Sequence, residues 1–243
     1  MNTGVDLSVV IPVFNEEACI RGTVVEIVEH LKQCGISHEL IAVNNGSTDG
    51  TGRILDELRL EQSSLIVVPL AVNDGYGGGI LAGWRRSRGR VIGFTCADGE
   101  VDANDIVTLF RVLDAGKLDL CKGKRIHRRD GLFRTVISFG YHILVGLLFR
   151  IHITDVNGYP VLMRRESLAA LDLQQRNWVF NLEVLFGARN LGLTIAEVDV
   201  EHRPRAGGRS HVRWYFPFVF LWQLLVYWRH CRGRYPQAAV REA

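Results

Sequence analysis

Two acidic side chains that follow an apolar run are the strongest candidates for chemistry in this chain. Residues 91–95, Val-Ile-Gly-Phe-Thr, have the composition of a buried strand, and Asp98 and Glu100 come soon after it. Hard oxygen ligands with this spacing can share one divalent cation, and ligands bind outside the carboxyl ends of such strands. The pattern therefore indicates a metal-assisted phosphate site for Mg²⁺ or Mn²⁺. The alternative is that both acids start a loop and cap the helix that follows Asp102.

Two other segments have the composition of loops that contact phosphate groups. Residues 44–51, Asn-Asn-Gly-Ser-Thr-Asp-Gly-Thr, follow an apolar run and open a helical pattern, so their N–H groups can face an anion. Turns of this composition commonly hold no ligand, however. Residues 73–79 contain four glycines in five positions, which let a backbone approach a ligand closely. They have neither the lysine of a P-loop nor a dinucleotide fingerprint.

Short β-branched runs alternate with helical patterns along the first half of the chain. We expect strands at residues 7–13, 39–43, 65–69 and 91–95, and helices at residues 17–33, around 54–58, at 79–88 and at 104–115. Later strands are expected at residues 118–121 and 194–200, with a basic loop after the first of them. This alternation predicts an α/β fold with a mostly parallel sheet that helices cover on both faces.

Length, charge and cysteine usage limit the class of protein. The 243 residues suffice for one large domain, and the formal net charge of +3 gives no argument for nucleic-acid binding. Basic residues gather at 85–90, 122–129 and 203–213, where they suit diphosphates or lipid phosphates. The five cysteines lack C-x-x-C spacing, so neither a disulfide framework nor a zinc site is indicated. We expect a protein of the reducing cytosol without a secretory signal.

Two uncharged stretches, residues 135–149 and 214–228, are rich in apolar and aromatic side chains. Fifteen helical residues span about 22 Å, short of the roughly 30 Å of a hydrocarbon core, so they should lie at the membrane interface. The alternative is burial within the domain or in the interface of a homo-oligomer. We expect a catalytic domain over residues 1–211 and a membrane-interface helix with a basic tail over residues 212–243.

Taken in order, these segments resemble family 2 of the inverting glycosyltransferases, and within it the dolichol-phosphate mannosyltransferase-like branch that uses polyprenyl-phosphate acceptors. Residues 10–17, Val-Ile-Pro-Val-Phe-Asn-Glu-Glu, match the opening motif of the family, and residues 205–211 match its Arg-x-x-Gly-x-Ser-Lys/His loop. The resemblance implies a GT-A type, Rossmann-like three-layer α/β/α sandwich. It also implies a nucleoside-diphosphate sugar donor, GDP-mannose or a UDP-hexose, and a polyprenyl phosphate acceptor at the membrane surface.

The resemblance assigns roles to individual positions. The donor-binding residues implied are Pro12, Asn15, Glu16, Asn44, Asn45, Ser47, Asn73, Gly75, Gly77, Ala97, Asp98, Arg205, Ser210 and His211. The residues implied for the acceptor phosphate are Arg125, Arg134 and Ser138. The metal ligands implied are Asp98 and Glu100, and the catalytic candidates are Asp98, Asp155 and Glu183.

Several positions depart from the family pattern. Cys96 stands where the first acid of the Asp-x-Asp motif is expected, Tyr76 where a lysine is expected, and Pro160 where an arginine is expected. Asn44 and Asn45 replace two acids, which keeps hydrogen-bonding capacity but removes charge. A neutral thiol cannot take over the role of a carboxylate, so we expect the geometry or choice of the donor to differ.

The implied reaction moves a sugar from its nucleotide to a polyprenyl phosphate with inversion, by a protein peripheral on the inner, cytoplasmic face of the membrane. A phosphate acceptor is already an anion, so Asp155 and Glu183 would orient it, whereas a hydroxyl acceptor would need one of them as a base. Either residue could also be a structural ion-pair partner. The alternatives are a soluble family 2 transferase that acts on a sugar or other hydroxyl, and a degenerate, non-catalytic module that binds nucleotide-sugar or lipid.

Overall fold

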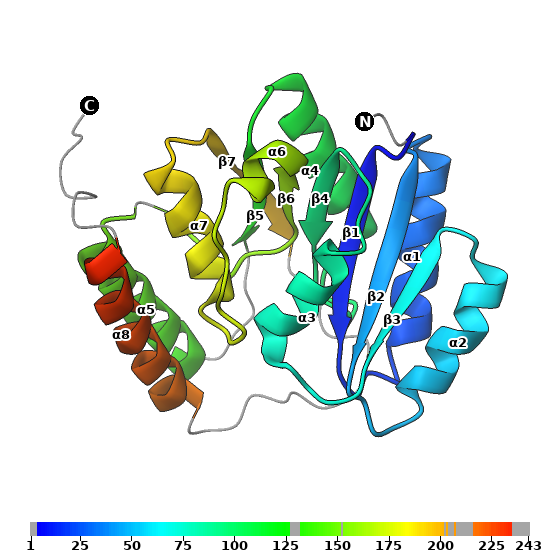
Figure 1. The fold of residues 1–243 in the computed structure, drawn as a ribbon, viewed down its shortest axis with the longest axis horizontal. Coiled ribbons are helices and arrows are strands. Elements are labelled where there is room, and N and C mark those ends of the chain that lie inside the picture. The colour runs from blue at the N-terminus through cyan, green and yellow to red at the C-terminus, as the bar shows by residue number, and fades with distance from the viewer. Residues whose placement is uncertain are drawn as a thin grey trace.

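The computed structural model describes residues 4–126, 132–151, 153–201, 203, 207 and 216–234. For residues 132–139, 216, 217 and 232–234 it describes the backbone alone. Strands and helices alternate along this part of the chain (Figure 1). The strands are β1 (Leu7–Val13), β2 (His38–Asn45), β3 (Leu65–Leu70), β4 (Val91–Phe94), β5 (Leu120–Ile126), β6 (Val161–Arg164) and β7 (Ile195–Glu201). The helices are α1 (Ile20–Gln33), α2 (Thr51–Glu61), α3 (Gly75–Trp84), α4 (Ala103–Ala115), α5 (Leu132–Phe149), α6 (Arg165–Ala169), α7 (Phe180–Asn190) and α8 (Phe216–Arg234).

The strands form one sheet in the order β3-β2-β1-β4-β6-β5-β7. Strand β6 is antiparallel to both of its neighbours, β4 and β5, and the other pairings are parallel. Strands β4 and β5 therefore point in the same direction, and their carboxyl ends lie at the same edge of the sheet as that of β1. The prediction of a mostly parallel sheet is confirmed.

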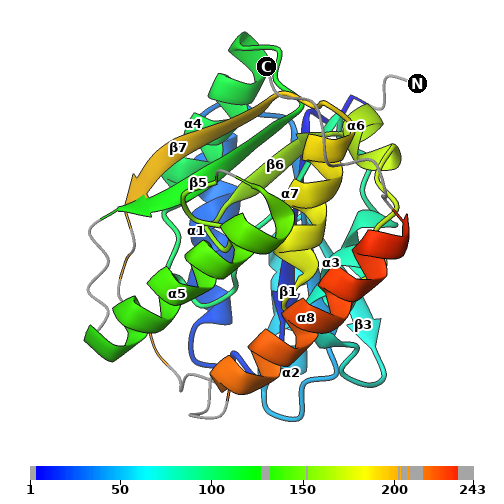
Figure 2. The same cartoon turned by 90° about the vertical axis from the view of Figure 1, so that its left-hand side faces the viewer.

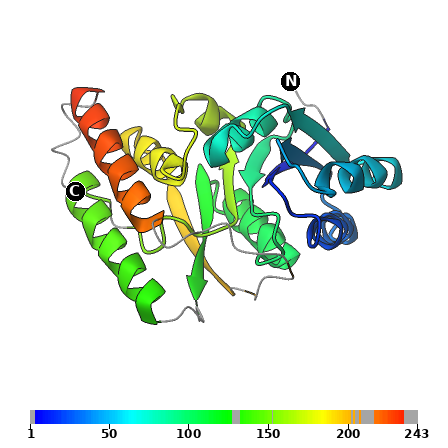
Figure 3. The same cartoon turned by 90° about the horizontal axis from the view of Figure 1, so that it is seen from below.

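Helices cover both faces of this sheet because its central strands are apolar on both sides. Six of the seven residues of β1 are buried, without the alternation of a strand that has one wet face. One core packs α1, α2 and α4 against the sheet, and the other packs α3, α5, α7 and α8 against the opposite face. Figure 3 shows the helices on either side. The predicted three-layer α/β/α sandwich is confirmed.

The strand order changes direction between β1 and β4. Strand β1 pairs with β2 on one side and with β4 on the other, and Leu7 lies opposite both His38 and Val91. Ligands of open α/β sheets bind in the crevice outside the carboxyl ends of the strands at such a switch point. Asn15 follows β1 and Asp98 follows β4 at this crevice, so the fold brings two of the predicted segments to one place.

The elements differ from the sequence predictions most clearly at α3, β5 and β6. Helix α3 begins at Gly75 and ends at Trp84, four residues earlier at each end than predicted, so the glycines form its first turns. Strand β5 continues to Ile126 where a basic loop was predicted, because its ladder with β7 runs from Leu120 to Ile126. Strand β6 was not predicted.

Helices α5 and α8 lie side by side on the outside of the domain (Figure 2). The rings of Tyr141 and Phe220 are 4.8 Å apart, those of Phe149 and Tyr227 are 5.7 Å apart, and the indole N–H of Trp228 donates to the carbonyl of Leu148 at 3.1 Å. These contacts advance together along both helices, so the pair is parallel. No helix within the described ranges is long and apolar enough to span a membrane.

Candidate functional site

The turn after β1 and the turn after β2 hold each other in place. The N–H of Asn15 donates to the hydroxyl of Ser47 at 3.1 Å, and its side-chain oxygen accepts from the N–H of Thr48 at 2.8 Å. The N–H of Glu16 donates to the hydroxyl of Thr51 at 2.9 Å. Asn15 has φ of 55°, a left-handed conformation that asparagine tolerates better than most residues. The opening motif and the 44–51 turn thus form one wall of the crevice.

The side chains of the two asparagines at the end of β2 form hydrogen bonds with backbone groups of neighbouring turns. The side-chain oxygen of Asn44 accepts from the N–H of Ser47 at 3.1 Å. The buried amide of Asn45 donates to the carbonyl of Gly75 at 2.9 Å and accepts from the N–H of Asp74 at 2.9 Å. A carboxylate could accept but not donate, so an amide is the group that can join β2 to the start of α3 in this way. This bridge explains the asparagine at position 45.

The glycines at the start of α3 allow the loop at residues 175–176 to pack closely against this helix. The N–H groups of Gly77 and Gly78 donate to the carbonyl of Arg176 at 3.0 and 3.4 Å. A Cβ on Gly75 would lie 2.2 Å from that carbonyl oxygen, and a Cβ on Gly77 would lie 2.3 Å from the oxygen of Gln175. The close approach predicted for a ligand is made by a protein loop at these two glycines, and donor binding by Gly75 and Gly77 stays a prediction. Asn73 supports this turn, because its side chain accepts from the N–H of Gly75 at 2.8 Å.

The carboxylate of Glu183 holds the same loop from its other side. Glu183 is buried in the first turn of α7 and accepts from the N–H of Gln174 at 3.1 Å and from that of Gln175 at 2.8 Å. Two backbone donors and burial fit a carboxylate that anchors a loop. The geometry therefore supports the structural alternative for Glu183 rather than proton transfer.

Tyr76, which stands where the family pattern has a lysine, belongs to a group of neutral side chains. Tyr159 donates its hydroxyl to that of Tyr76 at 2.6 Å, Tyr76 donates to the side chain of Asn181 at 3.3 Å, and Asn181 donates back to Tyr159 at 3.2 Å. The ring of Tyr76 stacks on Trp178 with centroids 4.9 Å apart. Burial raises the pKa of both tyrosines, that of Tyr159 to about 12, so the closed ring of hydrogen bonds stays uncharged.

The acidic segment after β4 presents Asp98 and Glu100 at the crevice. The side chain of Asp98 accepts from the N–H of Glu100 at 3.2 Å across Gly99, whose φ of 76° makes the turn. Burial, followed by the charge of Asp98 and a hydrogen bond to it, raises the pKa of the Cys96 thiol well above its usual value. The thiol stays protonated and neutral, so Cys96 orients Asp98 but brings no negative charge.

Asp98 and Glu100 fit a cation that arrives together with a diphosphate. Within the described residues no three His, Cys, Asp or Glu side chains form a cluster that could hold a metal ion by themselves. Mg²⁺ commonly binds through one or two carboxylates and takes its other ligands from water and substrate phosphates. Two hard oxygen donors beside a neutral thiol match that pattern better than they match a zinc site.

Asp155 and Arg125 form a fixed pair at the carboxyl end of β5. The guanidinium donates to the two carboxylate oxygens at 2.7 and 2.9 Å, and the N–H of Arg125 donates to the same group at 3.2 Å. Burial opposes ionisation of Asp155, but the hydrogen bonds and charge of Arg125 outweigh it and lower the pKa of the carboxyl to about 2. Asp155 is therefore a permanent carboxylate that orients Arg125.

A buried lysine, Lys122, contacts the backbone of the same pair. Lys122 is fully buried, and its ammonium group donates to the carbonyls of Gly123 and Asp155 and reaches the carboxylate of Glu197 at 3.3 Å. Burial lowers its pKa, while the two acids work against that shift. Glu197 in turn accepts from the hydroxyl of Thr154 at 2.6 Å. Sequence reasoning counted Lys122 only as part of a basic cluster and missed Glu197, because burial decides both roles.

The segment after β7 returns to the crevice. Arg203 pairs with Glu26 at 2.7 Å and with Asp102, and its N–H donates to the carbonyl of Glu100 at 3.1 Å. The carbonyl of Gly207 accepts from the thiol of Cys19 at 3.2 Å. Of the predicted ligands, Arg205, Ser210 and His211 lie outside the described residues. Arg134 and Ser138 belong to α5, but their side chains also lie outside the described set.

The remaining donor candidates lie around the same crevice. A Cβ on Gly79 would lie 3.1 Å from Pro12 and 3.2 Å from the amide of Asn45, so the end of β1 packs against α3. The carbonyl of Ala97 accepts from the hydroxyl of Thr23 at 3.1 Å, which fixes the strand end before Asp98. The structure thus gathers the predicted residues of the β1, β2 and β4 ends.

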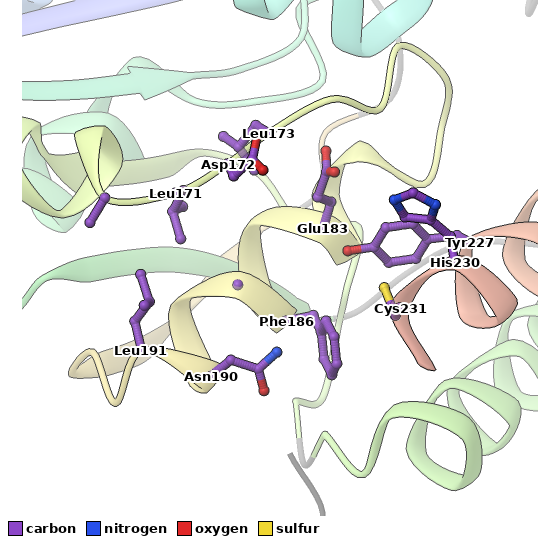
Figure 4. A pocket seen from close by; sticks show the side chains of 12 residues that line it. Leu171, Asp172, Leu173, Glu183, Phe186, Asn190, Leu191, Tyr227, His230 and Cys231 are labelled. Atoms are coloured by element: carbon purple, nitrogen blue, oxygen red, sulfur yellow. The ribbon is translucent and has the colours of Figure 1, made fainter. Parts of the chain in front are cut away.

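A separate pocket lies between α7 and α8 (Figure 4). Its lining includes Glu183, Asn190, Tyr227, His230 and Cys231, together with apolar residues of the 170–173 segment. It faces α8 rather than the strand ends that carry Asp98. Sequence reasoning did not predict this pocket, since it depends on how α8 packs.

Comparison with known proteins agrees with this geometry. The chain matches the model of glycosyl transferase family 2 over residues 8–172. It is 29% identical over 228 residues to the dolichyl-phosphate beta-glucosyltransferase of Mus musculus, covering 86% of this chain and 70% of that protein. The protein of the same name from Dictyostelium discoideum is 28% identical over 213 residues, covering 80% of this chain and 65% of that protein. The chain thus spans about two thirds of the length of these relatives.

Solved structures share the fold. Glucosyl-3-phosphoglycerate synthase from Mycobacterium tuberculosis, in complex with Mn²⁺, UDP-glucose and phosphoglyceric acid, superposes with a TM-score of 0.68 at 22% identity, covering 100% of this chain and 83% of that chain. Its complex with Mn²⁺, UDP and glucosyl-3-phosphoglycerate gives a TM-score of 0.69 at 20% identity. These likenesses support the predicted GT-A type fold. Because the family model spans more than half of the chain, the chain belongs to glycosyl transferase family 2.

Proposed function

We propose that the protein transfers glucose from UDP-glucose to a polyprenyl phosphate, with inversion at the anomeric carbon. The names of the curated relatives support glucose and a lipid phosphate. The ligands of the structurally similar enzyme support a UDP donor and Mn²⁺ or Mg²⁺. GDP-mannose remains a second donor candidate, because the family resemblance alone allows it.

The observation that carries the choice of acceptor is that both candidate bases are already engaged. Asp155 is a carboxylate with a pKa of about 2, paired with Arg125, and Glu183 accepts backbone N–H groups of a loop. A hydroxyl acceptor needs a group that removes its proton, whereas a phosphate acceptor is an anion at neutral pH. The arrangement of Asp155 and Glu183 therefore favours a phosphate over a hydroxyl.

The donor would lie in the crevice with its diphosphate toward Asp98 and Glu100. A divalent cation bound there supplies Lewis-acid neutralisation of the leaving diphosphate. The protein contributes the fixed carboxylate of Asp98, oriented by the N–H of Glu100, and the neutral thiol of Cys96. The turns at Asn15 and Ser47 would hold the nucleoside, because they form the wall of the crevice beyond β1 and β2.

The acceptor phosphate would lie at Arg125. Asp155 holds the guanidinium in one orientation, which reduces the entropy lost when a phosphate binds. The carboxyl ends of β4 and β5 share one edge of the sheet. Tyr159 lies between them, because its ring is 6.1 Å from that of Phe94 on β4 and a Cβ on Gly123 of β5 would lie 2.1 Å from its carbonyl oxygen. Donor and acceptor sites would therefore face each other across Tyr159.

The paired helices α5 and α8 would rest on the membrane that contains the acceptor. Their outward faces carry large apolar side chains: Ile143, Leu147, Phe218, Val219, Leu221, Trp222, Leu225 and Val226. Leu147, Phe218 and Trp222 are 74, 68 and 65% exposed, which is costly in water and favourable in the headgroup region. The inner faces of both helices pack on the core, so only one side is available for lipid.

We expect the double variant Phe218→Ser with Trp222→Ser to lose membrane binding. Moving two large apolar side chains from lipid to water costs about 1.5–3 kcal/mol each, so the fraction bound should fall at least about tenfold. Sedimentation with phosphatidylglycerol vesicles measures this fraction. Leu60→Ser is the control, since Leu60 is also an exposed apolar residue but lies on α2, which packs on the opposite face of the sheet from α8. Equal sedimentation of the double variant and the control would contradict the assignment.

The proposed reaction is tested with purified protein, UDP-glucose labelled in the sugar, Mn²⁺ and a polyprenyl phosphate in detergent. We expect label in the lipid fraction as an acid-labile β-linked phosphodiester. UDP-glucose at about 100 times its dissociation constant should also stabilise the fold by about 2.7 kcal/mol. Label transferred to sugar hydroxyls instead would favour the soluble transferase, and no stabilisation by any nucleotide-sugar would favour the degenerate module.

A further inference from the structure

His142 is a second basic side chain at the Asp155–Arg125 pair. Its ring nitrogen Nε2 lies 3.9 Å from the carboxylate oxygen Oδ1 of Asp155, and the side chain is largely buried. Arg125 occupies the same carboxylate from β5, whereas His142 reaches it from α5. Arg125 and His142 therefore face one carboxylate from two different elements. That set suits an additional anion better than it suits an isolated ion pair.

The position of His142 on α5 connects this basic set with the apolar surface. Ile143 follows it directly and Leu147 lies one turn further, and both are exposed. One helix thus places a basic side chain toward Asp155 and apolar side chains toward the outside within two turns. A lipid with an anionic head and an isoprenoid chain matches this arrangement, because its head can contact the basic side chain while its chain contacts the apolar ones.

The sequence spacing agrees with a shared role. Residues 134, 138 and 142 are four apart, the spacing of one face of a helix. The residues at the first two positions, Arg134 and Ser138, were predicted for the acceptor phosphate. Of the three positions, His142 is the one whose side chain is described, and it contacts Asp155 beside Arg125. The spacing was the signal that sequence reasoning could have used to find His142.

We propose that His142 binds the acceptor phosphate together with Arg125, so that α5 positions the head of the lipid while its apolar face holds the chain. This inference rests on the proposed function and names a further residue of that acceptor site. The imidazole N–H can donate a hydrogen bond to a phosphate oxygen. Asp155 keeps Arg125 oriented and limits the repulsion between the two basic groups.

The test compares His142→Gln and His142→Lys with His230→Gln, a control at an exposed histidine on α8. The steady-state KM values for a short polyprenyl phosphate and for UDP-glucose are measured separately, together with thermal unfolding. We expect His142→Gln to raise the acceptor KM about tenfold and to leave the donor KM unchanged. We expect His142→Lys to restore most of the acceptor affinity, because it returns a cation to the same place.

Different failures point to different errors. An unchanged acceptor KM in His142→Gln, or an equal rise in both KM values, would overturn the role of His142 while leaving the reaction intact. A His142→Lys variant that folds like the parent but binds acceptor as weakly as His142→Gln would also overturn it. No lipid-linked product from the parent protein would overturn the proposed function itself.

Discussion

Asp98→Asn is expected to lower kcat for glucose transfer about 10³-fold. The substitution keeps the size of the side chain and its acceptor for the N–H of Glu100, but it removes the negative charge that would hold the cation at the diphosphate. The thiol of Cys96 cannot replace that charge, because burial alone raises its pKa and keeps it neutral. The rate at saturating Mn²⁺ and UDP-glucose is the quantity to measure.

The matched control for this variant is Asp56→Asn, which removes an exposed carboxylate from α2. The control should retain the parental kcat. Binding of UDP without metal should be similar in both variants, because the turns at Asn15 and Ser47 are unchanged. A kcat within threefold of the parent in Asp98→Asn would show that the cation does not depend on this residue, and would move the assignment toward Glu100 alone.

Asp155→Asn is expected to lower the free energy of unfolding by about 3 kcal/mol, since it leaves a largely buried guanidinium without its counter-charge. The guanidinium of Arg125 loses both of its hydrogen bonds to a carboxylate. The ammonium group of Lys122 loses its electrostatic interaction with Asp155 and keeps that with Glu197. Urea unfolding at pH 7 measures the change. Asp199→Asn is the control, because Asp199 on β7 pairs with Lys124 of β5, the neighbour of Arg125, but is exposed, so its loss should cost less than about 1 kcal/mol.

The pH dependence of this effect has a definite sign. The pKa of Asp155 is about 2 in the folded protein and near its ordinary 3.8 when unfolded, so its contribution is complete above about pH 4. The contribution is lost as the pH falls from about 4 to about 2. The stability gap between parent and Asp155→Asn should therefore narrow in this window and stay constant above it. A gap that widens on acidification would contradict the depressed pKa.

The sequence by itself determined the architecture. Continuous apolar runs that alternate with helical patterns predict a sheet covered on both faces, and β1, β2 and β4 are buried in this way. The order of the motifs also determined the family, because residues 10–17, 44–51 and 96–100 all follow strands whose carboxyl ends meet at one edge. Local pattern suffices for such features, since each depends on residues that are neighbours in the chain.

Only the tertiary structure decided what several of the predicted residues do. The glycines of α3 look like a ligand cradle in sequence, but the carbonyl of Arg176, about a hundred positions away, occupies their N–H groups. Glu183 is an anchor and Asp155 an orienting carboxylate because of partners that other strands and loops bring to them. The distant contact of His142 with Asp155 arises in the same way. Burial and contacts with residues distant in the chain determine whether a side chain is charged and whether it can contact a ligand. Neither can be predicted from the residues that flank it.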